Sequence, residues 1–432
     1  MFYLLNLSMP FNKSTQFYYT CLYIVAFAIP LPYSFGSSSV ILLCISWLFS
    51  ANFKTFFKNL GQRKMLWLPI ILFVLHGISY FYSTDKQQSL MDLGKKASFV
   101  ILPIVVGLGP AINKRVLERI FAAFVSSISL LAVFFLLRAC IIWLKTHTIE
   151  HFFYHTLVAD FDANAIYYAL YSIFSISILL LHDWTEVKLF KRKPFYYIVV
   201  CIQILFLVLL SSKTLLLFFI IIVLPAFIYK RRRKSLLVPQ IIVASVLVIS
   251  LCLLAFTNNP IRVRYVQILK DDNYNAWQSD DPSGKHFSNL TLRLFIWKTA
   301  LENIKEHDLY WKGCGNGDVQ LYQKQKLHVY DSKIDTRYNP YIWQFNLHNQ
   351  FLQMFMMLGI IGLATFILFI FVPFFYLKAI PEKNIFLLFN ASFLFIILQE
   401  SALQTQAGII YYLFISSIFW QIFYNSKLSQ NA

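Results

Sequence analysis

The sequence predicts an all-α polytopic membrane protein with about twelve transmembrane helices and one large extracytoplasmic loop between spans nine and ten. Of its 432 residues, 58% are hydrophobic and only 13% are charged, and the mean hydropathy is +0.60. Soluble globular chains carry about 25% charged residues, so much of this apolar surface must face lipid. The apolar runs reach the roughly 20 residues that a helix needs to cross a bilayer. They do not alternate with polar residues, as the strands of a membrane barrel would.

The expected spans follow the apolar runs from one end of the chain to the other. They are 17–34, 37–53, 66–82, 97–112, 118–144, 164–182, 195–211, 214–229, 236–256, 350–377, 384–400 and 406–424. The chain is therefore expected to comprise transmembrane helices 1–9 (residues 1–256), a loop with amphipathic helices (257–349) and transmembrane helices 10–12 (350–432). The first run begins late and a second follows at once, which is not typical of a cleavable signal peptide.

The distribution of charge predicts the orientation of these spans. Twenty of the 38 Lys and Arg residues fall in segments on one side, where only four acidic residues oppose them. The basic residues are Lys13, Lys54, Lys58, Arg63, Lys64, Lys114, Arg115, Arg119, Lys188, Lys191, Arg192, Lys193, Lys230, Arg231, Arg232, Arg233, Lys234, Lys378, Lys383 and Lys427. By the positive-inside rule this side is cytoplasmic and holds both termini. The net charge of +18 thus reflects topology, and no nucleic-acid partner is expected.

The six cysteines predict no disulfide framework. Five of them lie within expected spans, and Cys314 is the only one in the 257–349 loop. A loop without disulfides must gain its stability from other contacts. We therefore expect it to pack against the membrane helices.

An amphipathic helix is expected in this loop from Ser288 onward. Leu290, Leu294, Trp297, Leu301 and Ile304 recur at helical spacing, with Arg293 among them. One interpretation of Arg293 is an exposed arginine that snorkels at the membrane surface. The other is an anion clamp, because a guanidinium presents a planar fork of donors that suits phosphate. The predicted helix is compatible with both interpretations of Arg293.

The sequence that follows this helix is rich in glycine. Gly313, Gly315 and Gly317 are too closely spaced for a dinucleotide-binding motif. They are expected to form a turn that needs positive φ angles.

A polar pair stands where the loop enters span ten. His348 and Asn349 come immediately before the apolar run that starts at residue 350. A helix N-terminus has unpaired N–H groups and a partial positive charge, which attracts anions and disfavours imidazolium. His348 is therefore expected to be neutral and able to accept a proton. The alternative is a helix-capping pair without chemistry, and placement alone favours that alternative.

These segments resemble the O-antigen ligase family, which also includes O-antigen polymerases and related oligosaccharyltransferases. His348-Asn349, nine further residues and then Gly359-Ile360-Ile361-Gly362 resemble its H-N-x9-G-x-x-G motif. The stretch 293–301, with the glycine turn after it, is similar to the arginine helix and glycine turn of that family's periplasmic loop. The detailed resemblance covers roughly 290–365, and the hydropathy layout agrees over the rest of the chain.

One position departs from the family pattern. Members carry an R-x3-L motif after the seventh span, facing the periplasm, and here Lys213 and Leu217 occupy the matching places. Lysine keeps the positive charge but loses the bidentate fork of arginine. The alternative interpretation of Lys213 is a hairpin lysine in the lipid headgroup layer.

The resemblance implies a bacterial inner-membrane glycosyltransferase that moves a glycan from undecaprenyl diphosphate to an acceptor hydroxyl at the periplasmic face, with inversion. Such a donor is already activated, so no metal or other cofactor is expected. The acceptor would be lipid A core, another glycan or a protein. The sequence does not choose among a ligase, a polymerase and a protein O-oligosaccharyltransferase.

The resemblance also implies roles for individual residues. His348 would be the catalytic base, and Arg293 would take part in catalysis while binding the diphosphate together with Lys213. Lys96 lies on the extracytoplasmic side, against the positive-inside trend, and is a further candidate for the diphosphate. Its alternative is a solvated lysine balanced by nearby aspartates. The supporting residues would be Asn349, Gln353, Trp297, Gly359 and Gly362.

A transporter and a metal site are the alternatives to this interpretation. A transporter or lipid flippase usually has inverted repeats and ionisable residues at mid-membrane. The expected spans here are nearly free of charge, with Arg138 as the main exception. A metal site would need a cluster such as His147, His151 and His155, but their aromatic neighbours favour an interfacial segment.

Overall fold

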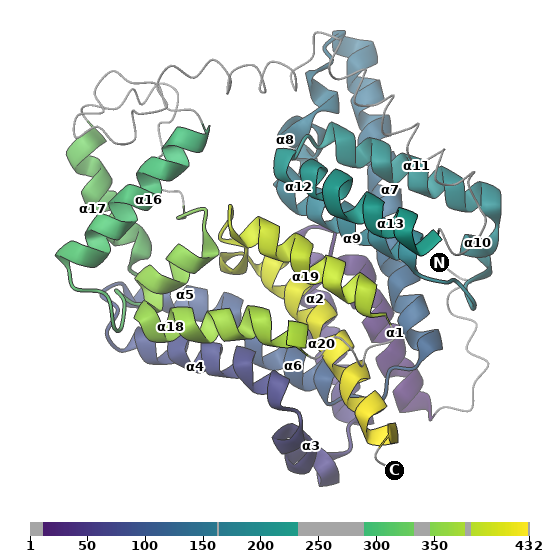
Figure 1. Ribbon diagram of the computed structural model, residues 1–432, viewed down its shortest axis with the longest axis horizontal. Coiled ribbons are helices and arrows are strands. Elements are labelled where there is room, and N and C mark those ends of the chain that lie inside the picture. Colours follow the sequence, from purple (N-terminus) through teal and green to yellow (C-terminus); the bar gives the residue numbers. More distant parts are fainter. Residues whose placement is uncertain (1–11, 162–163, 232–288, 332–345, 376–381, 431–432) are drawn as a thin grey trace.

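The computed structural model describes residues 12–161, 164–231, 289–331, 346–375 and 382–430, and every regular element among them is a helix (Figure 1). The helices that run from the N-terminus to the first gap are α1 (Lys13–Ala28), α2 (Tyr33–Ser50), α3 (Phe56–Gln62), α4 (Trp67–Tyr80), α5 (Lys86–Lys96), α6 (Ser98–Gly107), α7 (Lys114–Thr146) and α8 (Tyr154–Leu157). The later ones are α9 (Ala165–Leu181), α10 (Lys188–Lys191), α11 (Lys193–Leu209), α12 (Lys213–Phe218), α13 (Leu224–Arg231), α16 (Asn289–Glu306), α17 (Val319–Asp331), α18 (Gln350–Phe375), α19 (Lys383–Ile397) and α20 (Gln406–Gln430).

The apolar runs within the described residues are helical. Eleven of the twelve expected spans contain a described helix, and the ninth, 236–256, lies outside the described residues. By length and composition, α2, α7, α18 and α20 are able to cross a membrane, and shorter apolar helices accompany them. The all-helical architecture with several apolar helices is that of a membrane protein. The eighth expected span is interrupted, because a π-helical segment, Phe219–Val223, joins α12 to α13.

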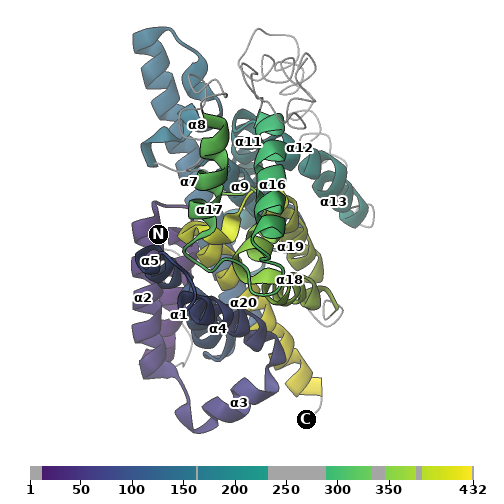
Figure 2. The same ribbon diagram turned by 90° about the vertical axis from the view of Figure 1, so that its left-hand side faces the viewer.

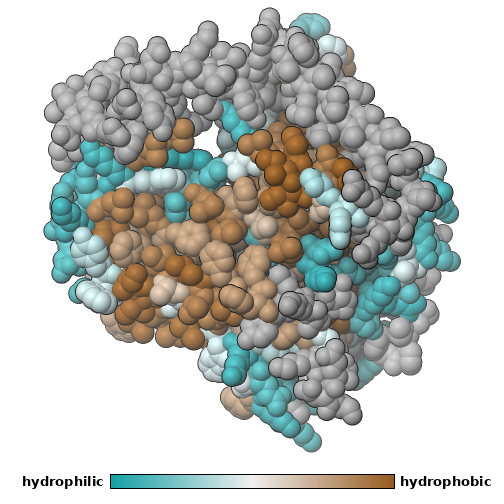
Figure 3. Space-filling view, in the orientation of Figure 1, coloured by the Kyte–Doolittle hydropathy of each residue, from teal (hydrophilic) through white to brown (hydrophobic). Residues whose placement is uncertain are grey.

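The bundle buries α9 and α20 at its centre. Aromatic rings fill the contact between α19 and α20, where Phe393 stacks on Tyr412 with 4.1 Å between ring centroids. Both side chains are fully buried. By contrast, Ile361 and Leu368 on α18 and Val74 on α4 are more than half exposed. Figure 3 shows this face as a broad hydrophobic surface, as expected where helices meet lipid.

The described part of the 257–349 loop is a helical hairpin that stands beside the bundle. Helices α16 and α17 lie side by side in Figures 1 and 2. Lys326 on α17 joins them by ion pairs with Glu302 and Glu306 on α16. A helix is present here as expected, but its buried face differs from the expected stripe. Phe295 and Ile304 are buried, whereas Leu290 and Leu301 are 46% and 53% exposed. Cys314 is also buried, so the loop packs by contact, as expected from its lack of a disulfide framework.

The glycine turn of this hairpin docks into a kink of α18. Gly359 interrupts the helix with φ 65° and ψ −162°. Beside it, Cys314 N–H donates to the Met356 carbonyl (2.9 Å) and Gly315 N–H donates to the Met357 carbonyl (3.0 Å). Ile360 N–H completes the contact by donating to the Tyr310 carbonyl at 2.8 Å. A backbone ladder therefore ties the soluble hairpin to the longest helix of the C-terminal part.

The conformation of the turn agrees in part with the sequence. Gly313 and Gly315 have φ angles of 70° and 107°, so two of the three glycines adopt the conformation expected. Gly317 is not at positive φ, but a Cβ there would overlap the Asp85 carbonyl. Close approach of backbones, rather than dihedral freedom, explains this third glycine.

Candidate functional site

The carboxylate of Glu400 joins the two principal candidate residues. Its Oε1 lies 2.6 Å from Arg293 Nη2, and its Oε2 lies 2.9 Å from His348 Nδ1. Arg293 comes from α16, His348 from the segment before α18, and Glu400 from the connection between α19 and α20. All three side chains are partly buried, with 25%, 21% and 10% of their surface exposed. The loop and the bundle thus build this cluster together.

The backbone at His348 adopts an uncommon conformation just before the helix that follows. His348 has φ 47°, a left-handed conformation that is uncommon for residues other than glycine. Its N–H donates to Asn346 Oδ1 at 2.9 Å, and Asn349 Oδ1 caps α18 by accepting from Leu352 N–H at 3.0 Å. Such a conformation persists only where its surroundings fix it, and functional sites are where it is usually found.

Trp297 and Gln353 hold the residue before His348 from both sides. The indole Nε1–H of Trp297 donates to the Leu347 carbonyl at 2.8 Å, while Leu347 N–H donates to Gln353 Oε1 at 3.2 Å. Leu347 itself is fully buried. Trp297 and Gln353 therefore position the backbone that carries the imidazole.

The Glu400 contact determines which imidazole nitrogen is basic. An ionised carboxylate only accepts hydrogen bonds, so Nδ1 of His348 must carry the proton that they share. Nε2 is then the nitrogen that can accept a proton, as in the histidine of a hydrolytic triad. The other carboxylate oxygen is fixed by the guanidinium of Arg293. This arrangement can take a proton from a hydroxyl group beside a fixed positive charge.

Lys213 starts a helix next to this cluster. It is the first residue of α12, and the hydroxyl of Thr214 donates to Gln399 Oε1 at 2.6 Å. Gln399 directly precedes Glu400 in the sequence. The structure therefore brings the start of α12 to the connection that carries Glu400.

Lys96 is placed differently from the other cations. It is 1% exposed, and its ammonium donates to Asn316 Oδ1 and Gln404 Oε1, both at 3.1 Å. Burial lowers the pKa of the Lys96 ammonium from 10.5 to about 8, although the Asp92 carboxylate opposes the change. Lys96 thus holds two amides in place, and its binding of diphosphate stays a prediction.

This buried lysine should make stability depend on pH. Because the folded pKa of Lys96 lies below the unfolded one, the unfolded chain binds more protons between about pH 8 and 10.5, and stability rises with pH there. Across this pH window, the free energy of unfolding of the wild type should rise by about 1–3 kcal/mol relative to that of a Lys96→Met variant. Melting temperatures measured in detergent from pH 7 to 10 would reveal the gain.

The matched control is Lys95→Met, which removes the neighbouring, 44% exposed lysine. That variant should keep most of the wild-type rise in stability, because burial is the main cause of the lowered Lys96 pKa. Wild-type and Lys96→Met curves that stay parallel over the whole range would contradict the assignment.

Gly359 and Gly362 serve the kink of α18. A Cβ on Gly359 would overlap the Trp311 carbonyl, and a Cβ on Gly362 would overlap the side chain of Leu358. Their role is in the shape of the helix that follows His348, and neither contributes a polar group to the Glu400 cluster.

The sequence did not predict that Glu400 belongs to this cluster. A signal was present, because Glu400 is the only acidic residue after Glu382 in the whole sequence. A single carboxylate retained in an otherwise apolar region is expected to have a partner.

The histidines of the 147–155 segment form no such cluster. His147 ends α7 in a left-handed conformation, and His155 Nδ1 accepts from Ala165 N–H at 3.3 Å. Across the described ranges, no three His, Cys, Asp or Glu side chains are grouped to hold a metal ion.

The comparisons with known proteins agree with the motifs. Residues 198–367 match the family model described as O-antigen ligase. The matched segment contains Lys213, Arg293, His348 and both glycines of the kink. No curated protein matches the chain.

Proposed function

Because the chain belongs to the O-antigen ligase family over residues 198–367, we propose that it transfers a glycan from undecaprenyl diphosphate to an acceptor hydroxyl. The family implies glycan transfer of the ligase or polymerase type, with a lipid-linked glycan and an acceptor as partners. The proposal adds the carrier and the place: the periplasmic face of the bacterial inner membrane, with both termini in the cytoplasm.

The observation that supports this proposal most is the Arg293–Glu400–His348 cluster. His348 Nε2 takes the proton of the acceptor hydroxyl, and Glu400 stabilises the imidazolium that forms. The acceptor oxygen attacks the anomeric carbon opposite the diphosphate, and the bond from that carbon to the phosphate oxygen breaks. The product is a glycoside of inverted configuration, and undecaprenyl diphosphate leaves with the bonding electron pair.

The departing diphosphate needs positive charge close by. Arg293 has five N–H donors, and the contact with Glu400 uses one nitrogen of the fork. Arg293 and Lys213 would provide charge-assisted hydrogen bonds to the leaving group, where preorganised donors contribute most to catalysis. The proposed reaction then needs no metal ion.

The test is transfer by the purified protein in proteoliposomes. They would contain an undecaprenyl-diphosphate-linked glycan and lipid A core from the producing strain. We expect the glycan on the acceptor, inversion at the anomeric carbon by NMR, and unchanged activity in EDTA. Movement of the lipid-linked glycan across the bilayer without any transfer would contradict the proposal in favour of a transporter.

Three acceptors fit the proposed chemistry, and a deletion strain separates them. Finished polymer that accumulates on the lipid carrier would indicate a ligase to lipid A core. Single repeat units without polymer would indicate a polymerase. Loss of glycan from a protein alone would indicate a protein O-oligosaccharyltransferase.

A conservative change at Arg293 should show how much its planar fork of donors contributes to transfer. Arg293→Lys keeps the charge but loses the paired donors, so we expect kcat/KM for the lipid-linked donor to fall by about tenfold or more. Arg115→Lys is the matched control, because Arg115 pairs with Glu186 at 2.8 Å outside the site. Equal donor kinetics in the two variants would remove Arg293 from the diphosphate site.

A further inference from the structure

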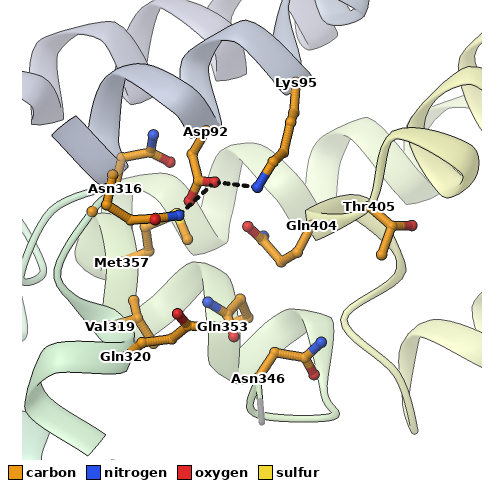
Figure 4. A pocket seen from close by; sticks show the side chains of 12 residues that line it. Asp92, Lys95, Asn316, Val319, Gln320, Asn346, Gln353, Met357, Gln404 and Thr405 are labelled. Carbon is orange, nitrogen blue, oxygen red and sulfur yellow. Dashed lines mark hydrogen bonds and ion pairs between the residues drawn. The ribbon is translucent and has the colours of Figure 1, made fainter. Parts of the chain in front are cut away.

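A polar cavity lies beside the Glu400 cluster and is lined mainly by amides. Its volume is about 150 Å³, far more than the roughly 10–15 Å³ that one water needs. Gln88 and Asp92 of α5, Asn316 of the glycine turn, Gln320 of α17, Gln353 of α18 and Gln404 before α20 contribute to its wall. In Figure 4, side chains converge on the cavity from segments that are far apart in the sequence, among them Asp92, Gln320 and Gln404.

The wall offers both donors and acceptors of hydrogen bonds. An amide side chain presents a carbonyl oxygen and an NH2 group, which together complement a hydroxyl that both donates and accepts. Val319 and Met357 add apolar surface to the same cavity. The charges largely cancel, because Asp92 accepts from Lys95 at 2.9 Å. Neutral hydroxyl groups next to apolar C–H faces are the chemistry of a sugar ring.

One amide nitrogen in this wall has no hydrogen-bond partner among the residues that the structure describes. The Nε2 atom of Gln404 is buried and makes no hydrogen bond with any described residue. Its carbonyl oxygen is held by the Lys96 ammonium, which fixes the amide orientation. Asn316 is fixed from the same ammonium, and its NH2 group donates to the Ser89 carbonyl at 3.0 Å. A buried donor without a partner is unfavourable, and a hydrogen bond to a ligand acceptor would remove that cost.

The cavity borders the backbone that carries the catalytic histidine. Asn346, whose Oδ1 accepts from His348 N–H, lines it, and so does Gln353, which accepts from Leu347 N–H. At the other side, Gln404 follows Glu400 by four residues. Anything bound in the cavity is therefore adjacent to the segments that hold both members of the His348–Glu400 pair.

From these contacts we propose that the cavity is a sugar subsite, which binds one uncharged monosaccharide unit through its hydroxyl groups. This inference rests on the proposed glycan transfer and specifies which part of a substrate the protein recognises. The unit belongs to the acceptor glycan or to the lipid-linked donor, since both present the same hydroxyl chemistry. Lys96 is then a positioning residue that orients Gln404 and Asn316.

The experiment measures sugar binding without catalysis. Full-length protein in nanodiscs would be mixed with lipid-free core oligosaccharide or with the repeat unit released from its diphosphate, and binding followed by saturation-transfer NMR. Gln404→Met removes the amide at similar size, so the dissociation constant should rise about fivefold. Gln203→Met is the control, because Gln203 is a fully buried amide that contacts Ser129 inside the bundle, away from the cavity.

The outcomes separate the sources and the two proposals. Weaker binding of core oligosaccharide alone assigns the subsite to the acceptor, and weaker binding of the repeat unit alone assigns it to the donor. His348→Ala should bind both sugars normally while losing transfer. If transfer fails in the wild type but Gln404→Met still weakens sugar binding, the proposed function falls and the subsite remains.

Equal binding by Gln404→Met, Gln203→Met and the wild type would overturn the subsite. Gln320→Leu provides a second variant on α17 should Gln404→Met not fold, and it should weaken binding of the same sugar. Normal binding by a folded Gln320→Leu protein would count against the proposal in the same way.

Discussion

Replacement of His348 by alanine is expected to lower the rate of glycan transfer by about 10²–10⁴-fold, the usual contribution of a positioned general base. The imidazole is fixed by its hydrogen bond to Glu400 and by the left-handed backbone at residue 348. Insertion and melting temperature should change little, because the side chain is at the open edge of the cluster. Initial rates in proteoliposomes, with saturating donor and acceptor, measure the effect.

Glu400→Gln tests whether the carboxylate works through the histidine. The variant keeps the size of the side chain but cannot stabilise an imidazolium by charge, so transfer should fall by at least tenfold. Residues that act as one unit give strongly non-additive losses. His348→Ala/Glu400→Gln should therefore be about as slow as His348→Ala alone. Losses that simply multiply would show that the two side chains act independently.

Glu306→Gln is the control for this pair. Glu306 is an exposed carboxylate on α16 that pairs with Lys326, away from His348. Its replacement should leave the rate of transfer unchanged. Wild-type rates in His348→Ala would end the assignment of the general base.

Gly359→Ala should damage both stability and activity. The dihedral angles of Gly359 fall in a region that is essentially restricted to glycine, and an unfavourable backbone of this kind costs about 1–3 kcal/mol. In addition, the new Cβ would overlap the Trp311 carbonyl and push the glycine turn away from α18. We expect a lower melting temperature together with slower transfer, since His348 precedes the same helix.

Gly77→Ala is the matched control, because Gly77 lies within α4 and a Cβ there meets nothing within 4 Å. Alanine is favoured over glycine inside a helix by roughly 0.5–1 kcal/mol, so this variant should be as stable as the wild type or more stable. Thermal unfolding in detergent measures both variants. A Gly359→Ala protein with wild-type stability and rate would contradict the role of the kink.

The sequence predicted the apolar helices well because their signal is local. The expected spans 195–211 and 384–400, for example, differ by only a few residues from α11 and α19. Helices α5 and α17 were not predicted, since short polar helices lack a long apolar run. The π-helical segment inside the eighth expected span was missed for the opposite reason, as its residues are apolar throughout.

The candidate site was predictable only where one segment carries its own pattern. Arg293 and His348 stand out through helical spacing and through the motif before Gly359. Glu400 is 52 residues from His348, and nothing near position 400 indicates that the chain returns to it. For Lys96, the charge was noticed, but its burial against Asn316 and Gln404 depends on tertiary packing.

The ladder between the glycine turn and α18 has a consequence for biogenesis. A break in a helix at membrane depth leaves peptide groups without partners, and lipid offers none in exchange. Here the carbonyls of Met356 and Met357 receive their donors from residues 314 and 315, which precede the helix in the chain. A newly inserted α18 would therefore remain a straight helix, or would lack a fixed conformation at the kink, until the hairpin docks. We expect membrane insertion of α18 and folding of the loop to be completed together.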